Sequence, residues 1–489
     1  MKVLLINPPY LKKFSRPQRS PAVTKSGTLY FPMWLAYATG VLEQKGFEVD
    51  LIDAPADNFS IENIIEKTGT FQPNLIVLDT STPSIDNDIT VARKLKETCP
   101  GAFIILVGTH VSALPEEVLN KDTCIDAIAR NEYDYTLPDL AKTLSEKGDL
   151  KNVQGISYRN GSKIIHNPGR PYIENLDELP FVSTVYKKFL RIENYFNPNA
   201  LYPMVTITTS RGCPFPCTFC VYPQTLMGRG FRQRSIENVV EEMEYITKNF
   251  PQAKAIFFED DTLTVNKKRC KELAEGILKK KVNISWTANA RVGLDYETMQ
   301  TMRIAGCRSL CVGFESGSQQ VLDNMKKKLS LSEMESFMAN AKKAGMLIHG
   351  CFMAGLPGET KKTLQETLQL AKRLNPDTVQ FYPVMVYPGT EAYTWYKEKR
   401  LITTDNFSEW LTPEGLHNTV ISTEELSSYD LVKFCDDARR SFYLRPGYLL
   451  YKLKQMIVHP GEIKRTLKSA KTFFKYLLRG SDIKPKAQC

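Results

Sequence analysis

Three cysteines in one short loop are the residues best suited to chemistry in this sequence. Cys213, Cys217 and Cys220 lie in "RGCPFPCTFC" at spacings of four and three. Thiolates are soft ligands that iron-sulfur clusters and zinc prefer. Three of them can hold three corners of a 4Fe-4S cluster and leave the fourth iron open. A zinc site with a distant fourth ligand is the alternative, although no histidine lies at finger-like spacing.

The cysteine loop follows the first of six apolar runs that alternate with helical periodicity from about residue 201. These runs are "MVTITT", "AIFFED", "ISWTAN", "SLCVGFE", "IHGCFMAG" and "VQFYPV". Six β/α units are too few for a complete eight-stranded barrel, so we expect a partial (β/α)6 barrel. Chemistry in such folds collects at the carboxyl ends of the strands. Polar residues follow the other strands there: Glu259, Asp260, Asp261, Asn289, Arg291, Glu315 and Ser316.

The first 150 residues predict a second α/β unit. Five short apolar runs read as buried parallel strands: "KVLLI", "FEVDLID", "NLIVLD", "FIILVG" and "IDAIA". The segments between them carry helical spacing, and two of these segments end in glycine. This order is typical of a doubly wound sheet, which binds its ligand across the carboxyl ends of its strands.

The remaining segments define the expected domain organisation. "ISYRNGSKIIH" predicts a hairpin on Asn160-Gly161, followed by a proline-punctuated connector. The pattern after residue 400 is helical. We therefore expect a first domain at 1–150, a hairpin and linker at 151–194, a barrel domain at 195–400, and a helical C-terminal domain at 401–489.

Composition and charge exclude several classes of protein. Hydrophobic residues at 42% and charged residues at 24% are ordinary globular values, and the eleven cysteines do not resemble a disulfide framework. No run is long enough for a spanning helix, and the start is too short for a signal peptide, so we expect a cytoplasmic protein. The net charge of +10 sits almost entirely after residue 441, which disfavours nucleic-acid binding by the core.

The basic tail carries an amphipathic stripe. Residues 461–479 place apolar side chains on one helical face, with four lysines beside it. This stripe is either a core-facing helix, the more common case, or a membrane-surface helix attracted to anionic lipid. The second alternative would put the protein at the inner membrane surface.

The cysteine loop resembles the signature of radical S-adenosylmethionine (SAM) enzymes, including the aromatic Phe219 before the last cysteine. In that family the open iron binds SAM, and electron transfer from the cluster yields a 5'-deoxyadenosyl radical. Further stretches resemble successive motifs of the cobalamin-binding subfamily. They are "FRQRS", "FFEDDTLT", "WTANAR", "VGFESGSQQVLDNMKK", "GCFMAGLPGETKKTLQET" and "YPVMVYPGT".

The resemblance implies roles for residues in the barrel. A SAM pocket needs a cation for the carboxylate, an acid for the ammonium group and a glycine-lined approach for ribose and adenine. Our candidates are Arg234, Glu315 with Ser316, and the turn that begins at Gly313. Glu259 and Asp260 are candidates for binding SAM or substrate. A strand-end ion pair or a helix cap is the structural alternative for each of them.

The first domain resembles the cobalamin-binding domain of the same subfamily. Candidate contacts lie after its third, fourth and fifth strands: Ser81, Thr82, Gly108, His110 and Glu132. The Asp-x-His-x-x-Gly motif that supplies a lower axial histidine is absent, so we expect base-off cobalamin without a protein histidine on cobalt. His110 is equally well explained as a loop-packing residue. A phosphate-binding first domain fails because the G-x-G-x-x-G pattern is missing.

The resemblance implies C-methylation of an unactivated carbon as the activity. Radical ring contraction or rearrangement of a lipid-linked substrate is the alternative, because the sequence motifs most resemble those of the branch that makes the cyclitol ether of bacteriohopanetetrol. A non-catalytic cobalamin or iron-sulfur sensor is the alternative from another class. The expected partners are an electron donor such as a flavodoxin or ferredoxin, and a lipid, small-molecule or peptide substrate.

Overall fold

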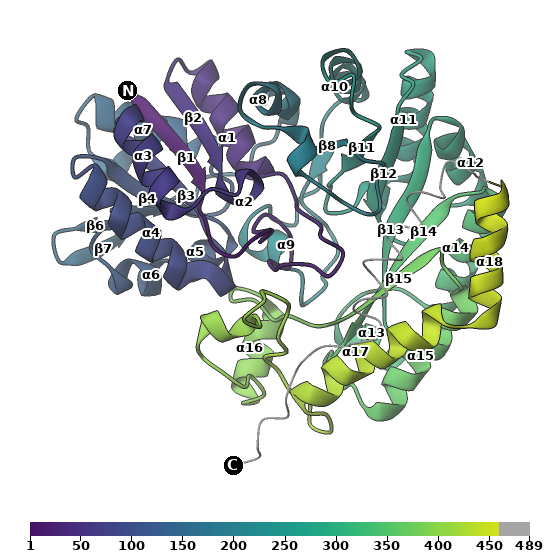
Figure 1. Cartoon of the computed structure of the whole chain (residues 1–489). Helices are drawn as coiled ribbons and strands as arrows, with labels where there is room; N and C mark the ends of the chain where they lie inside the picture. The colour runs from purple at the N-terminus through teal and green to yellow at the C-terminus, as the bar shows by residue number, and fades with distance from the viewer. Residues whose placement is uncertain (459–489) are drawn as a thin grey trace.

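Two large sheets, one mixed and one parallel, organise the computed structural model, which describes residues 1–458 (Figure 1). The first sheet has the strand order β2-β1-β3-β4-β5-β6-β7. Its parallel strands are β1 (Lys2–Asn7), β2 (Glu48–Asp53), β3 (Leu75–Asp79), β4 (Phe103–Val107) and β5 (Ala127–Ala129). The order of the first five strands is that of a doubly wound sheet, as the alternating pattern predicted.

Helices cover both faces of the first sheet. They are α1 (Met33–Gln44), α2 (Ala54–Asp57), α3 (Ile61–Phe71), η1 (Thr82–Ser84), α4 (Ile85–Thr98), α5 (Thr109–Ala113), α6 (Pro115–Lys121) and α7 (Thr136–Ser145). Helix α3 ends at Phe71, and its C-cap residue Gln72 adopts the left-handed conformation (φ +52°) and donates its N–H to the carbonyl of Thr68.

The predicted hairpin is present as β6 (Ile156–Asn160) and β7 (Lys163–His166). It pairs antiparallel with β5 and so extends the first sheet. The short helix η2 (Leu150–Asn152) precedes the hairpin. The linker after the hairpin forms η3 (Leu176–Glu178), α8 (Val182–Phe189) and η4 (Ile192–Asn194). Helix α8 packs between α1 of the first unit and the barrel helix α10. The boundary near residue 150 stays a prediction.

The second sheet contains six parallel strands in the order β8-β11-β12-β13-β14-β15. They are β8 (Met204–Ile207), β11 (Ala255–Phe258), β12 (Ser285–Ala290), β13 (Cys307–Glu315), β14 (Leu347–Ala354) and β15 (Thr378–Pro383). All six coincide with the predicted runs. The two ends of the sheet do not pair with each other, so the barrel is partial, as expected.

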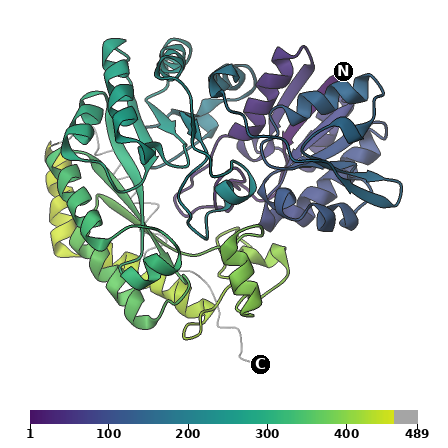
Figure 2. The ribbon, with the colours of Figure 1, turned by 180° about the vertical axis from the view of Figure 1, so that it is seen from behind.

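Helices line the outer face of this curved sheet (Figures 1 and 2). They are α10 (Ile236–Asn249), α11 (Lys267–Lys279), α12 (Tyr296–Ile304), α13 (Gln319–Asn324), α14 (Leu331–Lys343) and α15 (Lys361–Leu374), with η5 (Leu263–Val265). Shorter elements at the strand ends are β9 (Ser210–Arg211), β10 (Arg232–Gln233), α9 (Val221–Thr225), α16 (Glu391–Glu398) and η6 (Phe407–Trp410).

The chain after residue 400 packs on both units. Helix α17 (Ser428–Tyr443) covers β14 and β15, and α18 (Pro446–Val458) follows along the outside of the barrel (Figure 1). The loop around η6 contacts η1 and α4 of the first unit. In residues 1–458, no helix is long and apolar enough to cross a membrane. The predicted stripe at 461–479 lies outside the described residues.

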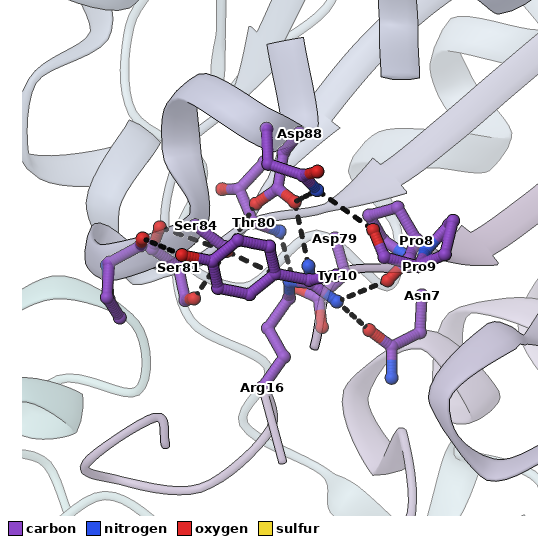
Figure 3. A network of polar contacts seen from close by, with 12 residues as sticks. Asn7, Pro8, Pro9, Tyr10, Arg16, Asp79, Thr80, Ser81, Ser84 and Asp88 are labelled. Carbon is purple, nitrogen blue, oxygen red and sulfur yellow. Dashed lines mark hydrogen bonds and ion pairs between the residues drawn. The ribbon is translucent and has the colours of Figure 1, made fainter. Parts of the chain in front are cut away.

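A buried ion pair fixes the long loop that leaves β1. Arg16 donates to Asp88 at 2.7 Å, and the two side chains are 1% and 0% exposed (Figure 3). The same guanidinium donates to Asn7, to the carbonyl of Pro8 and to Ser84. A buried charge needs this many partners, since desolvation otherwise outweighs the attraction. The loop is therefore held at the carboxyl ends of β1 and β3.

Two arginines then join the units in opposite directions. Arg19, three residues after the anchored Arg16, crosses to the barrel, where it pairs with Glu259 and Asp261. Arg211 of the barrel crosses to the first unit, where it pairs with Glu132 at 3.2 Å and Asp134 at 2.8 Å. We call these contacts the two arginine clamps. They set the carboxyl ends of the two sheets against each other.

Replacing Arg211 with methionine should destabilise the protein strongly. The guanidinium is 1% exposed and stacks over Trp34 and Tyr37, so its loss leaves buried carboxylates with less compensation. Breaking such a buried pair costs about 3–5 kcal/mol. Chemical denaturation monitored by circular dichroism measures the change. The matched control is Arg170→Met, whose partner Asp139 is 55% exposed and whose loss should cost under about 1 kcal/mol. Equal effects of the two substitutions would contradict the clamp.

Candidate active site

The cysteine loop leaves β8 and is fastened at several backbone positions. Cys213 donates its N–H to Gly228 at 3.4 Å, and Thr218 donates its N–H to Met325 at 3.1 Å. Gly212 has φ +82°, and a Cβ there would lie 2.1 Å from the carbonyl oxygen of Gly230, so only glycine fits. The loop is thus set in shape by its backbone.

The three thiols of this loop differ from ordinary exposed cysteines. Cys217 is buried, while Cys213 and Cys220 are half-buried. Burial raises the pKa of Cys213 to about 11, although the nearby cation Lys327 acts to lower it. Burial also raises the pKa of Cys220, although Arg19 acts to lower it. Thiols that resist ionisation need a strongly positive partner to become thiolates, which an iron-sulfur cluster supplies. The donor set therefore fits a cluster.

The arrangement of the three thiols does not by itself distinguish zinc from an iron-sulfur cluster. Within residues 1–458, no group of three or more His, Cys, Asp or Glu side chains is arranged to hold a metal ion. The assignment of the thiols to a cluster consequently depends on their number, their spacing and their place at the carboxyl end of β8.

Glu315 ends β13 in an unusual conformation. Its φ is +67°, a left-handed value that costs a residue with a side chain about 1–3 kcal/mol. The pairing register between β13 and β14 shifts at this point. Lys327 donates to its Oε1 at 2.8 Å, whereas its Oε2 is buried and has no partner among the described residues. The structure thus holds one carboxylate oxygen ready for a ligand.

The position of Glu315 suits a SAM ammonium group. Lys327 interacts electrostatically with both Glu315 and Cys217, so the free oxygen lies in the same part of the barrel as the cysteine loop. A Cβ on Gly313 would lie 2.1 Å from Oε1 of Glu315, so the glycine makes room for that carboxylate. Ser316 contacts Thr367 at 3.3 Å and so holds the turn against α15. Glu315 and Gly313 therefore fit the group that the motif implied.

The acids that follow β11 divide into two roles. Asp260 is 0% exposed and accepts hydrogen bonds from Thr209 at 2.6 Å and Ser210 at 2.7 Å, so it orders the start of the cysteine loop. Glu259 pairs with Arg19, but its Oε2 is buried without a partner in residues 1–458. Burial raises the pKa of Glu259, although the positive charge of Arg19 acts to lower it. Glu259 therefore stays available for a ligand, and Asp260 does not.

Arg234 and Glu132 both lie in buried ion pairs. Arg234 pairs with Glu242 and donates to the carbonyl of Thr208 at 2.9 Å. Glu132 belongs to an arginine clamp and also accepts from Arg232 at 2.7 Å. Their roles as cofactor contacts stay predictions. Phe219 is partly buried and packs on the core next to the loop.

The remaining candidates of the first unit meet at the ends of β3 and β4. Gly108 has φ +121°, and a Cβ there would lie 2.5 Å from the carbonyl oxygen of Thr80. His110 Nδ1 contacts Thr82 Oγ1 at 3.2 Å, whereas its buried Nε2 has no partner within residues 1–458. Ser81 contacts Ser84 at 2.7 Å. A buried, unpaired polar atom at the carboxyl end of a doubly wound sheet fits a ligand such as cobalamin.

His110 also shows how the loop around η6 closes over this edge. Its ring lies 4.9 Å from that of Phe407 in an edge-on arrangement. Burial lowers its pKa to about 3, so the imidazole is neutral at physiological pH. Whether cobalt lacks a histidine ligand stays a prediction.

Several residues of this site carried no signal in the sequence. Lys327 lies inside a quoted motif, yet only the fold shows that it pairs with Glu315. Arg19 and Glu259 are separated by 240 residues, and no local pattern links them. A charged residue inside an otherwise irregular proline-containing loop was the one available hint for Arg19.

Comparisons with known proteins agree with this geometry. The radical SAM superfamily model matches residues 207–371, and the B12 binding domain model matches residues 19–141. A protein of Pyrococcus horikoshii named "Uncharacterized methyltransferase PH0819" is 31% identical over 470 residues, 96% of this chain and 97% of the relative. The anaerobic magnesium-protoporphyrin IX monomethyl ester cyclase of Rubrivivax gelatinosus is 26% identical over 461 residues, 92% of this chain and 79% of the relative.

A solved structure shares the fold over most of the chain. The radical SAM methyltransferase TsrM of Kitasatospora setae, with cobalamin and a [4Fe-4S] cluster bound, superposes with a TM-score of 0.66 at 17% identity. The match covers 81% of this chain and 75% of TsrM, so it shows a common fold. Together with the two family models, the similarity to the Pyrococcus relative over nearly the whole chain decides the assignment. This chain belongs to the radical SAM superfamily, as an enzyme with a B12-binding domain whose cofactors are a 4Fe-4S cluster, SAM and cobalamin.

Proposed function

We propose that this enzyme transfers a methyl group to an unactivated carbon. The observation that carries the proposal is the pair of arginine clamps, Arg19 and Arg211, which set the carboxyl ends of the two sheets against each other. A substrate between the sheets would then reach both cofactors. When bound, the cluster with SAM supplies hydrogen-atom abstraction, and cobalamin supplies the methyl group. The printed name of the Pyrococcus relative supports methyl transfer.

The residues of the chain have separate tasks in this proposal. Cys213, Cys217 and Cys220 would hold the cluster as thiolates. The free oxygen of Glu315 would accept a hydrogen bond from the ammonium group of SAM, and Lys327 holds that carboxylate in its orientation. Glu259 would accept a polar group of SAM or substrate through its own free oxygen. Buried side chains around these groups exclude water, which strengthens each charge interaction.

Ring formation or rearrangement is the second candidate. The Rubrivivax relative, which covers most of this chain, is named a cyclase. The same clamps and the same thiols would serve that reaction. An electron donor, such as a flavodoxin or ferredoxin, and a lipid, small-molecule or peptide substrate are the partners that we propose for either reaction.

Replacing Cys217 with alanine should abolish the chemistry while leaving the fold intact. The loss of one of three thiolates removes the cluster, so reduction under anaerobic conditions should yield no 5'-deoxyadenosine. Cells supplied with deuteromethyl-labelled methionine should also lose one labelled lipid, peptide or small molecule. The control is Cys99→Ala, a buried thiol of the first unit, which should retain both signals. Formation of 5'-deoxyadenosine without any labelled product would favour the ring chemistry. If the wild-type protein with all cofactors bound forms no 5'-deoxyadenosine, a non-catalytic sensor would be favoured.

Replacing Glu315 with glutamine should weaken SAM binding about tenfold to a hundredfold. A hydrogen bond to a charged group contributes about 1.5–3 kcal/mol, and the amide cannot carry the negative charge. Equilibrium dialysis of SAM against the cluster-loaded protein measures the affinity, and iron content should not change. Glu335→Gln, an exposed acid on α14, is the matched control. Unchanged affinity in the Glu315 variant would remove this carboxylate from the SAM site.

We also propose that the protein is cytoplasmic and binds the membrane surface through its C-terminal region. Four large apolar side chains of α18 are exposed by 45–79%: Leu449, Leu450, Leu453 and Ile457. Their spacing puts them on one stripe of the helix, beside basic residues that continue into the sequence after it. An apolar face flanked by cations suits an anionic lipid surface.

Vesicle sedimentation tests this membrane contact. The full chain should sediment with vesicles of phosphatidylglycerol and phosphatidylcholine, and much less with phosphatidylcholine alone. The double variant Leu450→Glu, Ile457→Glu should reduce binding about tenfold, since each side chain loses a favourable burial. Leu278→Glu, an apolar residue 41% exposed on α11, is the control. If the double variant sediments like wild type, the face of α18 is not the lipid contact.

A further inference from the structure

A cavity of about 350 Å³ borders the cysteine loop at Thr218. It opens between the start of α15, the helix α16 and the segment that leads into α17. Thr218, which directly follows Cys217, lines it, and so does Glu359. None of the residues proposed above to bind SAM or cobalamin lines it. The cavity therefore touches the cluster loop without belonging to the site already described.

Two buried polar groups line this cavity without partners. Glu359 is 2% exposed, and its Oε2 accepts from the backbone N–H groups of Gly355 and Leu356. Its Oε1 has no hydrogen-bond partner in residues 1–458. The Thr218 hydroxyl is 5% exposed and likewise lacks a partner among these residues. A native structure rarely leaves such atoms unpaired, since each costs about 1–3 kcal/mol.

The charge of the cavity is of one sign. Glu391, Glu424 and Glu425 line it together with Glu359, and among residues 1–458 no Lys, Arg or His lines it. Lys326 pairs with Glu391 from outside the lining, which leaves the other three carboxylates to attract a cation. These three carboxylates lie at different depths in the cavity: Glu359 is buried, whereas Glu424 and Glu425 are exposed. A ligand that enters from solvent would therefore meet the exposed acids first and the buried acid last.

The remaining walls are aromatic and apolar. Trp395 and Tyr396 line the cavity, with ring centroids 4.7 Å apart in an edge-on arrangement, beside Leu356 and Pro357. Aromatic faces attract cations, and apolar walls accept an alkyl chain. A charged nitrogen on a short chain matches all three features of the cavity: a buried carboxylate, an aromatic wall and an apolar wall.

We propose that this cavity binds a protonated alkylamine, with its nitrogen between Glu359 Oε1 and the Thr218 hydroxyl. The ligand would be either a free small amine or a lysine side chain of a docked protein. The backbone of Thr218 is held by Met325 and Ala392, so a ligand on its hydroxyl contacts the loop at the residue next to a proposed cluster ligand. Binding of a ligand in the cavity would therefore act directly on the cysteine loop. This inference does not depend on the proposed methyl transfer.

Calorimetric titration of the cluster-loaded full chain tests the site, with n-butylammonium as the first probe and Nα-acetyl-lysine-methylamide as the second. Magnesium chloride and tetraethylammonium serve as further arms. We expect saturable, one-to-one binding of both amines, and at least tenfold weaker binding to Glu359→Gln. The glutamine retains an acceptor for the backbone of Gly355, so the loop should keep its fold. The control is Glu398→Gln, an exposed acid of α16 outside the cavity, which should bind like wild type.

The affinity should also rise with pH. Burial raises the pKa of Glu359 to about 8, so the carboxylate is largely neutral at pH 6.5 and ionised above 8.5. The titratable groups that interact with it are Tyr396 and Cys435, whose own pKa values are raised by burial, so both are neutral over this range. Amine binding should therefore strengthen between these two pH values and lose this dependence in Glu359→Gln.

Each outcome decides between the possibilities. Binding of both amines with the expected effect of Glu359→Gln supports the site, and binding of only the lysine mimic assigns it to a protein partner. Binding of magnesium in preference to the amines would overturn the ligand class. Equal affinities of the wild type and Glu359→Gln, or no saturable binding, would overturn the site. Because binding is measured without turnover, a failure of methyl transfer leaves this result intact.

Discussion

Charge pairing across the interface between the two sheets is the constraint on which the rest of the structure depends. Arg19 extends from the first unit to acids at the end of β11, and Arg211 extends from the end of β8 to acids of the first unit. Arg19 lies in the loop after β1, and the other residues of the clamps follow β5, β8 and β11 at the strand ends where ligands bind in parallel sheets. The same residues that join the units therefore also orient the candidate cofactor sites toward each other.

The clamps are built on anchors of their own. Arg19 can cross the interface because Arg16, three residues earlier, is fixed by Asp88 and the end of β1 (Figure 3). Arg211 directly precedes Gly212, whose left-handed backbone starts the cysteine loop. Movement at the interface would consequently reach the thiols through the backbone. This coupling gives a physical reason for an enzyme with cofactors in both units to bury so many charges in one place.

Strain and unpaired atoms mark where ligands are expected. Glu315 adopts a left-handed conformation, and Glu315, Glu259, Glu359 and His110 each have one buried polar atom without a partner in residues 1–458. Such features cost stability and persist where the surrounding structure holds them. Three of these atoms lie at strand ends that the family resemblance had already indicated. Glu359 instead lines the inferred amine cavity, which none of the proposed SAM-binding residues lines.

The sequence by itself determined the strands of both sheets, the hairpin and the thiol spacing, because hydrophobic periodicity and short motifs are local properties. It identified Glu315 by its place after a strand, but not Lys327 as its partner. Arg234 was chosen for its charge alone, and only the fold shows that Glu242 already pairs with it. Tertiary structure decided both clamps, since Arg211 and Glu132 are 79 residues apart and charge has no sequence period that reveals a distant partner.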